Sequence, residues 1–362
     1  MENMVTNRNF WLGKRVFLTG HTGFKGSWLA LWLTDMGANV HGYALAPPTE
    51  PNFFTICKLS KYLKSHTVAD IRNADMLIDA MQKASPEIVF HLAAQPLVRY
   101  SYKNPIETFS TNVMGTVNLF EAARQTKSIK AIVNVTTDKC YENREWVWPY
   151  RENEAIGGFD PYSSSKACSE LVTSAYRRSF FASMNVHLAS ARAGNVIGGG
   201  DWAADRLIPD FLRSLHLNEI LTIRSPHATR PWQHVLEPLS GYLSLAEALY
   251  TKGESFADAW NFGPDDDDIC TVEWILNQLC SLRNGASWQI DTNPQMHEAF
   301  ALKLDSSKAK AQLGWHPRWN LRNAIEKVIE WDTAWQNKFD MTKFSLNQIN
   351  NYETTNETPM QS

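Results

Sequence analysis

The feature that most constrains the fold is a short apolar run followed by three closely spaced glycines. Residues 15–19 read as a buried strand, Gly20, Gly23 and Gly26 follow it, and the apolar-rich residues 27–36 have the length of a helix. In this order the first glycine permits a tight turn, the second lets backbone approach a pyrophosphate, and the third lets the helix pack on the strand. The N-terminus of the helix attracts the anion. The segment therefore predicts a dinucleotide-binding turn and, with it, a Rossmann-type fold.

The following sequence alternates between strand-like and helix-like segments. We expect strands at 39–43, 68–72, 88–92, 131–135 and 185–193, and helices at 74–84 and 113–124. This alternation is typical of an α/β protein with a doubly wound parallel sheet. Ligands bind such sheets at the carboxyl ends of the strands. The residues to examine are therefore Asp70, Ile71, Leu92, Ala93, Ala94, Gln95 and those at 136–139.

Charged residues near the second strand bear on which dinucleotide binds. Residues 44–48 contain neither an acidic residue for a ribose 2′-hydroxyl nor an arginine for a 2′-phosphate. The absence of a nearby cation favours NAD over NADP. Asp70 has two open interpretations, as a cofactor contact or as the N-cap of the helix expected at 74–84.

Tyr162 and Lys166 are candidates for proton and hydride chemistry. Residues four apart lie on one face of a helix, so the lysine ammonium can stabilise the tyrosine as a phenolate. Such a pair also occurs by chance on amphipathic helices, and it gains meaning from the glycine turn upstream. Thr137, Asp138 and Lys139, after the expected strand at 131–135, would add a hydroxyl, an acid and a base. The alternatives are strand-end packing for Thr137 and a surface ion pair for the other two.

Several segments together identify a family resemblance. They are Thr19-Gly20-His21-Thr22-Gly23-Phe24-Lys25-Gly26, His91-Leu92-Ala93-Ala94-Gln95, Thr137-Asp138-Lys139-Cys140-Tyr141, Pro161-Tyr162-Ser163-Ser164-Ser165-Lys166, and further motifs at 192–202, 230–235 and 313–319. The chain resembles the extended short-chain dehydrogenase/reductase superfamily and, within it, the CDP-glucose 4,6-dehydratases. Lys139 distinguishes the CDP-glucose dehydratases within the superfamily, because dehydratases that act on other nucleotide sugars usually have glutamate at this position.

The resemblance implies conversion of CDP-glucose to CDP-4-keto-6-deoxyglucose and water, for deoxysugar and O-antigen polysaccharide biosynthesis. Tyr162 would deprotonate the sugar 4-hydroxyl while NAD takes the C4 hydride, and Thr137 would polarise the 4-oxygen. By family position Asp138 is the acid toward the 6-hydroxyl and Lys139 replaces a glutamate base. The opposite assignment, with Asp138 as base and Lys139 as acid, fits their resting charges better, so both remain open as one coupled pair.

The expected binding residues fall into two groups. Those expected to bind the cofactor are Gly20, Thr22, Gly23, Phe24, Gly26, Asp70, Ile71, Leu92, Ala93, Ala94, Tyr162 and Lys166. Those expected to bind the substrate are Asn195, Arg230 and Arg206, and Arg206 is, with His297, a weaker candidate whose alternative is an ordinary surface residue. Arg230, in an expected loop, suits a diphosphate because its guanidinium is a planar fork.

The expected domain organisation is simple. We expect residues 1–195 with 230–262 to form an NAD-binding Rossmann domain, and 196–229 with 263–343 to form a smaller substrate-binding lobe. The asparagine- and threonine-rich residues 344–362 indicate a flexible polar tail. The resemblance also implies a homodimer or higher homo-oligomer, paired through the helix at 113–124 and the helix that carries Tyr162.

Composition excludes several classes of function. A net charge of −3 gives no electrostatic reason to expect nucleic-acid binding. The 5 cysteines are scattered without metal-ligand spacing and suit a reducing cytoplasm. The aspartates at 265–268 indicate a solvated loop, and we expect no metal. We find no signal peptide or membrane-spanning run.

Two alternatives to a dehydratase remain open. A nucleotide-sugar 4-epimerase or decarboxylase needs no elimination pair, and a non-catalytic NAD-binding sensor needs neither Tyr162 nor Lys166.

Overall fold

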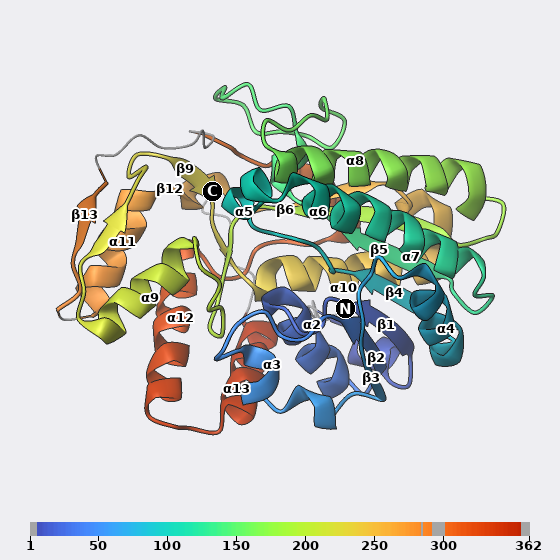
Figure 1. Ribbon diagram of the computed structural model, residues 1–362, viewed down its shortest axis with the longest axis horizontal. Coiled ribbons are helices and arrows are strands. Elements are labelled where there is room, and N and C mark those ends of the chain that lie inside the picture. Colours follow the sequence, from blue (N-terminus) through green and yellow to red (C-terminus); the bar gives the residue numbers. More distant parts are fainter. Residues whose placement is uncertain (1–5, 284, 292–300, 356–362) are drawn as a thin grey trace.

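The computed structural model describes residues 6–283, 285–291 and 301–355. Figure 1 shows a large sheet with helices on both faces and a smaller group of helices and short strands beside it. The large sheet has seven strands, all paired in parallel. They are β1 (Arg15–Thr19), β2 (Asn39–Ala44), β3 (Ser65–Val68), β4 (Ile88–His91), β5 (Ala131–Val135), β6 (His187–Ala193) and β11 (Ala259–Phe262).

The strand order is β11-β6-β5-β4-β1-β2-β3. The chain leaves β1 toward β3 on one side, returns to β4 on the other, and continues outward to β11. This is a doubly wound sheet whose winding direction reverses between β1 and β4, and it confirms the predicted fold class.

One predicted strand lies in the wrong place. The apolar residues at 68–72 suggested the third strand, whereas β3 covers Ser65–Val68. β3 is an edge strand and is largely exposed, so three of its four side chains are polar and it carries little apolar signal. Asp70 and Ile71 therefore follow the strand instead of forming part of it.

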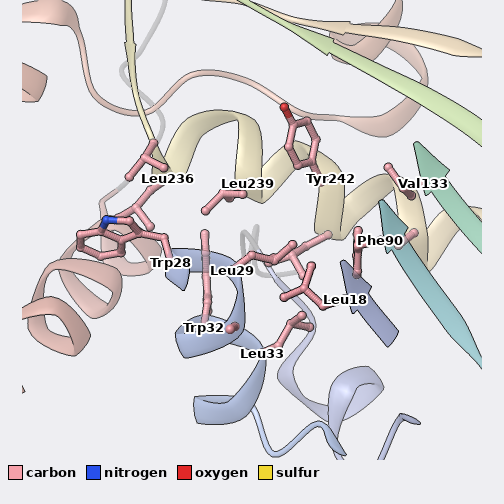
Figure 2. Close-up of a cluster of buried hydrophobic side chains, with 14 of the residues drawn as sticks. Leu18, Trp28, Leu29, Trp32, Leu33, Phe90, Val133, Leu236, Leu239 and Tyr242 are labelled. Atoms are coloured by element: carbon pink, nitrogen blue, oxygen red, sulfur yellow. The ribbon is translucent and has the colours of Figure 1, made fainter. Parts of the chain in front are cut away.

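Helices cover the two faces of the sheet. On one face lie α2 (Phe24–Asp35) and α10 (Leu236–Lys252), and on the other lie α4 (Ala74–Ala84), α7 (Gly115–Arg124) and α8 (Pro161–Tyr176). Because side chains alternate along a strand, Leu18 packs toward α2 and α10 whereas its neighbour Phe17 packs toward α4 and α7. Figure 2 shows Trp28 and Trp32 of α2 beside Leu239 of α10 in the first of these cores.

The smaller lobe has its own apolar core. It contains α9 (Leu207–Leu217), α11 (Val272–Leu282), α12 (Leu321–Gln336) and three two-stranded pairs. The pairs are β7 (Val196–Ile197) with β10 (Gln233–His234), β9 (Thr229–Pro231) with β12 (Ile269–Thr271), and β8 (Leu221–Ile223) with β13 (Trp288–Ile290). Shorter helices include α1 (Arg8–Trp11), α3 (Phe53–Ile56), α5 (Val98–Lys103) and α6 (Pro105–Phe109). The division into domains at 195, 230 and 262 stays a prediction.

The predicted flexible tail is wrong for residues 344–354. They belong to α13 (Met341–Thr354), which packs against α2 and α12. Ile349 and Tyr352 are fully buried, and the Tyr352 hydroxyl donates to the Glu237 carboxylate of α10 at 2.6 Å. The polar composition hid a narrow buried stripe at helical spacing, formed by Met341, Ser345, Gln348, Ile349 and Tyr352. Residues 356–362 lie outside the described part of the chain.

Two further findings concern the described residues only. Within them, no helix combines the length and the hydropathy needed to cross a membrane. The same ranges contain no group of three or more His, Cys, Asp or Glu side chains arranged to hold a metal ion.

Candidate active site

A cavity of about 1460 Å³ lies at the carboxyl ends of the central strands. It includes the point between β1 and β4 where the winding of the sheet reverses, which is the usual ligand site of such folds. The cavity brings together the predicted site residues of the described chain. They are Gly20, Thr22, Gly23, Phe24, Gly26, Asp70, Ile71, Leu92, Ala93, Ala94, Thr137, Asp138, Lys139, Tyr162, Lys166, Asn195, Arg206 and Arg230. His297 lies outside the described residues.

The glycine turn forms a bare backbone cradle on the cavity wall. Gly20 has a φ of +75°, and a Cβ on it would lie 2.7 Å from the backbone nitrogen of Ala93. A Cβ on Gly26 would lie 2.1 Å from the carbonyl oxygen of Gly20, so α2 begins against the turn only because this side chain is absent. Gly23 is the N-cap of α2 and offers no side-chain hydrogen bond to the helix N-terminus. These features fit the pyrophosphate of a dinucleotide.

Thr19 joins the loop after β1 to the loop after β4. Its hydroxyl oxygen accepts hydrogen bonds from the backbone N–H groups of Leu92 at 3.1 Å and Ala93 at 3.2 Å. The same hydroxyl lies 2.8 Å from Nδ1 of His91. Two cavity-lining segments that are about 70 residues apart in sequence are thereby held in register.

Asp70 lies on the cavity wall and is not a helix cap. The N-cap of α4 is Asn73, whose side chain accepts from the backbone N–H of Met76. The Asp70 carboxylate instead binds the Arg72 guanidinium in a bidentate ion pair, which lowers the pKa of that carboxyl. The N-cap interpretation is therefore wrong, and the Asp70–Arg72 pair forms part of the cavity lining.

Helix α8 presents Tyr162 and Lys166 to the cavity. Asp160 caps the helix by accepting from the backbone N–H of Ser163 at 2.9 Å, and Pro161 occupies the first turn. The Lys166 ammonium donates to the carbonyl oxygen of Val135 at 3.1 Å. Burial raises the pKa of the Tyr162 hydroxyl above its ordinary value and lowers that of Lys166 to about 8. Burial thus disfavours the charged form of both groups, and the charge of a ligand bound nearby would shift both pKa values.

The end of β5 turns directly into the segment that carries the other three candidates. The Thr137 hydroxyl donates to Oδ1 of Asp138 at 2.9 Å, and Oδ2 of Asp138 is buried with no hydrogen-bond partner. Asp138 is 1 % exposed, and burial raises the pKa of its carboxyl, although Lys139 acts in the opposite direction. The interpretation of Asp138 and Lys139 as a surface ion pair is therefore wrong.

Lys139 is partly buried and lines the cavity, and its ammonium has no hydrogen bond or ion pair with another described residue.

Three candidates approach the cavity from the smaller lobe or from its border. Arg206, just before α9, donates to the Asp201 carboxylate at 2.7 Å. Arg230 is buried in β9, where the sequence suggested a loop. Asn195 follows β6, and its carbonyl oxygen accepts from the backbone N–H of Gln233. The lobe and its border thus add two guanidinium groups to the cavity lining.

Sequence reasoning missed Lys25 as a candidate. This residue is the second residue of α2 and lines the cavity. Burial lowers the pKa of its ammonium to about 8, and the charges of Arg206 and Lys166 add to this effect. A lysine inside the glycine turn was the available signal, because a cation at a helix N-terminus opposes the helix dipole unless an anion binds nearby.

Comparisons with known proteins identify the family of this chain. A family model described as GDP-mannose 4,6 dehydratase matches residues 17–328, most of the chain. The chain belongs to this dehydratase family. A CDP-glucose 4,6-dehydratase from Salmonella typhimurium is 58% identical over 354 residues, which is 96% of this chain and 98% of that protein. A dTDP-glucose 4,6-dehydratase from the same organism is 24% identical, over 94% of this chain and 99% of its own length.

The fold extends beyond the dehydratases. A UDP-glucose-4-epimerase from Stenotrophomonas maltophila, solved with bound NAD and formylated UDP-arabinopyranose, superposes with a TM-score of 0.78. The two proteins are 19% identical, and the match covers 90% of this chain and 99% of the epimerase. At this identity the likeness concerns the fold alone.

The glycine turn gives a prediction that separates its structural role from its binding role. Gly26→Ala should lower the thermal midpoint of the protein without dinucleotide by several degrees, because the new Cβ meets the Gly20 carbonyl. Gly23→Ala should leave the midpoint nearly unchanged, because its Cβ lies 3.4 Å from the same oxygen, and should weaken NAD binding about tenfold. Calorimetry and fluorescence titration measure the two effects. Equal midpoints for the two variants would contradict the steric account.

Proposed function

We propose that this protein is an NAD-dependent nucleotide-sugar 4,6-dehydratase that converts CDP-D-glucose to CDP-4-keto-6-deoxy-D-glucose and water. The proposal rests on one observation, that two sets of residues line the same cavity. They are Thr137, Asp138 and Lys139 after β5, and Tyr162 and Lys166 on α8. The first three residues suit an elimination and the other two a hydride transfer. Identity of 58% to a relative named CDP-glucose 4,6-dehydratase supports CDP-glucose as the substrate.

The residues present fit NAD. Its pyrophosphate would lie on the bare turn formed by Gly20, Gly23 and the start of α2, with Lys25 beside it. Residues 44–48 add no cation, and the Arg72 guanidinium is already paired with Asp70, which supports NAD over NADP. When bound, NAD accepts a hydride from sugar C4 and returns it to C6, so it is regenerated in each turnover.

Tyr162 is the proposed base for the first step. As a phenolate it would take the proton of the sugar 4-hydroxyl. Burial raises the pKa of the Tyr162 hydroxyl, so the phenolate would depend on stabilisation by the Lys166 ammonium, one turn along α8. With substrate bound, the Thr137 hydroxyl would turn from Oδ1 of Asp138, to which it donates in this structure, and would donate to the 4-oxygen and polarise it. The resulting 4-ketone acidifies the proton on C5, which prepares the sugar for loss of water.

Asp138 is the proposed acid of the elimination. Its buried, unpartnered Oδ2 and raised carboxyl pKa favour the protonated form, which can donate to the departing 6-hydroxyl. Lys139 would then remove the C5 proton, and its unpaired ammonium must first lose a proton to do so. After water has left, a hydride at C6 and a proton at C5 complete the deoxysugar. The reverse assignment, with Asp138 as base, is an outcome of the test below.

The substrate diphosphate would contact the guanidinium groups of the smaller lobe. Arg230 and Arg206 both line the cavity, and Asn195 lies near them at the end of β6. Arginine suits a diphosphate because it donates two parallel hydrogen bonds to phosphate oxygens. We propose these three residues as substrate contacts.

A homodimer through α8 and its neighbours is also part of the proposal. Exposed apolar side chains gather on α6, the π-helical turn η2 (Ser110–Met114) and α8, which contact one another. Ile106 is 85% and Leu171 is 62% exposed, and Met114 is also exposed. Pairing of two such faces would bury this surface. Leu119 and Phe120 on the adjoining α7, and Ala167 on α8, are buried within one chain and take no part.

We further propose a cytoplasmic location and a place in deoxysugar biosynthesis. All five cysteines are free thiols, which suits a reducing compartment.

The choice of nucleotide is tested with a panel of CDP-, UDP- and dTDP-glucose and GDP-mannose. We expect kcat/KM for CDP-glucose to exceed the others by at least about tenfold, the value of one lost hydrogen bond to the base. Mass spectrometry should show loss of one water, and the 4-keto product should absorb in alkali. Equal turnover of UDP-glucose would contradict the nucleotide assignment, and a product of unchanged mass would indicate an epimerase.

The roles of Asp138 and Lys139 are separated by solvent exchange. Asp138→Asn should oxidise C4 but lose water about 100-fold more slowly, because the acid is missing. In heavy water its accumulated 4-keto sugar should gain deuterium at C5, since Lys139 still removes that proton. Lys139→Ala should accumulate the same ketone without deuterium at C5. The opposite labelling pattern would make Asp138 the base.

The proposed interface is tested by sedimentation of Leu171→Glu, which should be a monomer because a buried charge opposes pairing of the two faces. The matched control is Leu217→Glu, an exposed leucine on α9 of the smaller lobe, which should remain dimeric. A wild-type monomer, or a Leu171→Glu dimer, would contradict the interface.

A further inference from the structure

A buried ion pair lies directly behind residues 136–141. We call this segment the catalytic turn, because it carries Thr137, Asp138 and Lys139. Glu170 is on α8, one helical turn after Lys166, and Arg192 is on β6. Both side chains are buried, and Nη2 of Arg192 donates to Oε2 of Glu170 at 2.8 Å. The pair does not line the cavity, so it has no role in the chemistry proposed above.

The carboxylate of Glu170 holds the first end of the catalytic turn. Its Oε1 accepts a short hydrogen bond from the hydroxyl of Thr136, the residue before Thr137. Its Oε2 also accepts from the hydroxyl of Ser190 on β6 at 2.7 Å. Both carboxylate oxygens are thus satisfied, and the helix that carries Tyr162 is joined to the start of the turn.

The guanidinium of Arg192 holds the second end. Its Nη1 donates to the hydroxyl of Tyr141, the residue that ends the turn, at 2.8 Å and to the carbonyl of Glu152 at 3.0 Å. The Tyr141 hydroxyl in turn donates to Oδ1 of Asn261 on β11 at 2.7 Å. The segment 136–141 is therefore attached at both ends to one buried ion pair.

Stability alone does not explain this arrangement. Removing two charges from water costs about as much as their attraction returns, so apolar residues of similar volume would often serve as well. The pair also leaves Nε of Arg192 buried without a partner. A buried pair whose hydrogen bonds converge on both ends of one short turn fixes the geometry of that turn.

We propose that Glu170 and Arg192 are positioning residues, which set the distance from Asp138 and Lys139 to Tyr162 and Lys166 across the cavity. The inference rests on the proposed function, because that function assigns oxidation to α8 and elimination to the turn. Both steps act on one sugar ring, so the two groups must keep a fixed separation while the ring changes from alcohol to ketone. A shift of about 1 Å in such a separation lowers a rate by about 100-fold.

Glu170 has a second effect on the same helix. Its negative charge acts on Lys166 against the burial that lowers the lysine pKa. Loss of the charge should let Lys166 deprotonate at lower pH. The alkaline limb of the kcat profile should therefore move to lower pH in Glu170→Gln, an effect that a packing defect would not produce.

The test compares Glu170→Gln, Thr136→Val and Ser190→Ala in the NAD-loaded protein. Thr136→Val removes the hydroxyl that links Glu170 to the turn, at a residue that also lines the cavity, whereas Ser190→Ala removes a hydrogen bond to the same carboxylate from the sheet side. We expect Glu170→Gln and Thr136→Val to lower kcat for CDP-glucose by about 10- to 100-fold with KM within about threefold. Ser190→Ala should stay within about twofold, and only Glu170→Gln should shift the pH profile.

Hydrogen–deuterium exchange of the peptide covering 136–141 tests the positioning without any turnover. Its exchange should rise in Glu170→Gln and Thr136→Val but not in Ser190→Ala. Unchanged exchange or unchanged kcat in Thr136→Val would overturn the positioning role. A wild-type protein that does not turn over CDP-glucose, but whose variants show the expected exchange, would refute the proposed function and retain the positioning role. If Glu170→Gln does not fold, Thr136→Val decides the question alone.

Discussion

The close approach of Gly26 to the carbonyl oxygen of Gly20 is the constraint on which the site depends. It allows α2 to start directly at the end of β1, so the helix N-terminus faces the cavity. The Thr19 hydroxyl then binds the backbone of the loop after β4, across the reversal of the sheet. Because β4 is followed by β5 in the sheet, the same edge also receives the catalytic turn. One backbone contact thus sets where the cofactor and the reacting residues can meet.

The cavity lining contains both cations and carboxylates. The cations include Lys25, Lys139, Lys166, Arg206 and Arg230, and the carboxylates include the buried Asp138 and Asp160 and the Asp201 that pairs with Arg206. Burial lowers the pKa of Lys25 and of Lys166 to about 8, so these two ammonium groups are costly to keep charged without ligands. Two diphosphates, one from NAD and one from a nucleotide sugar, would supply the opposing charge. Asp138, whose carboxyl pKa is raised by burial, lies next to Lys139, and such a pair suits a dehydration that needs an acid and a base at once.

Much of the fold and of the site could be predicted from the sequence. The glycine turn, the alternation of elements and the Tyr162–Lys166 spacing are local patterns whose physical causes are local. The failures involve tertiary context. β3 is an exposed edge strand with little apolar signal, and α13 hides a narrow buried stripe in a polar segment. Of the two interpretations open for Asp70, the helix cap is excluded because Asn73 caps α4. The link from Thr136 to Glu170 spans 34 residues, and no spacing rule indicates it.

The central claim is that one cavity removes a hydride from C4 and returns the same hydride to C6 of the same sugar. The direct measurement uses CDP-glucose deuterated at C4, mixed with a carbon-13-labelled sample that lacks deuterium. The account predicts deuterium at C6 of the product, confined to molecules without carbon-13. Deuterium that appears in the carbon-13 molecules, passes to the solvent or returns to C4 would contradict it.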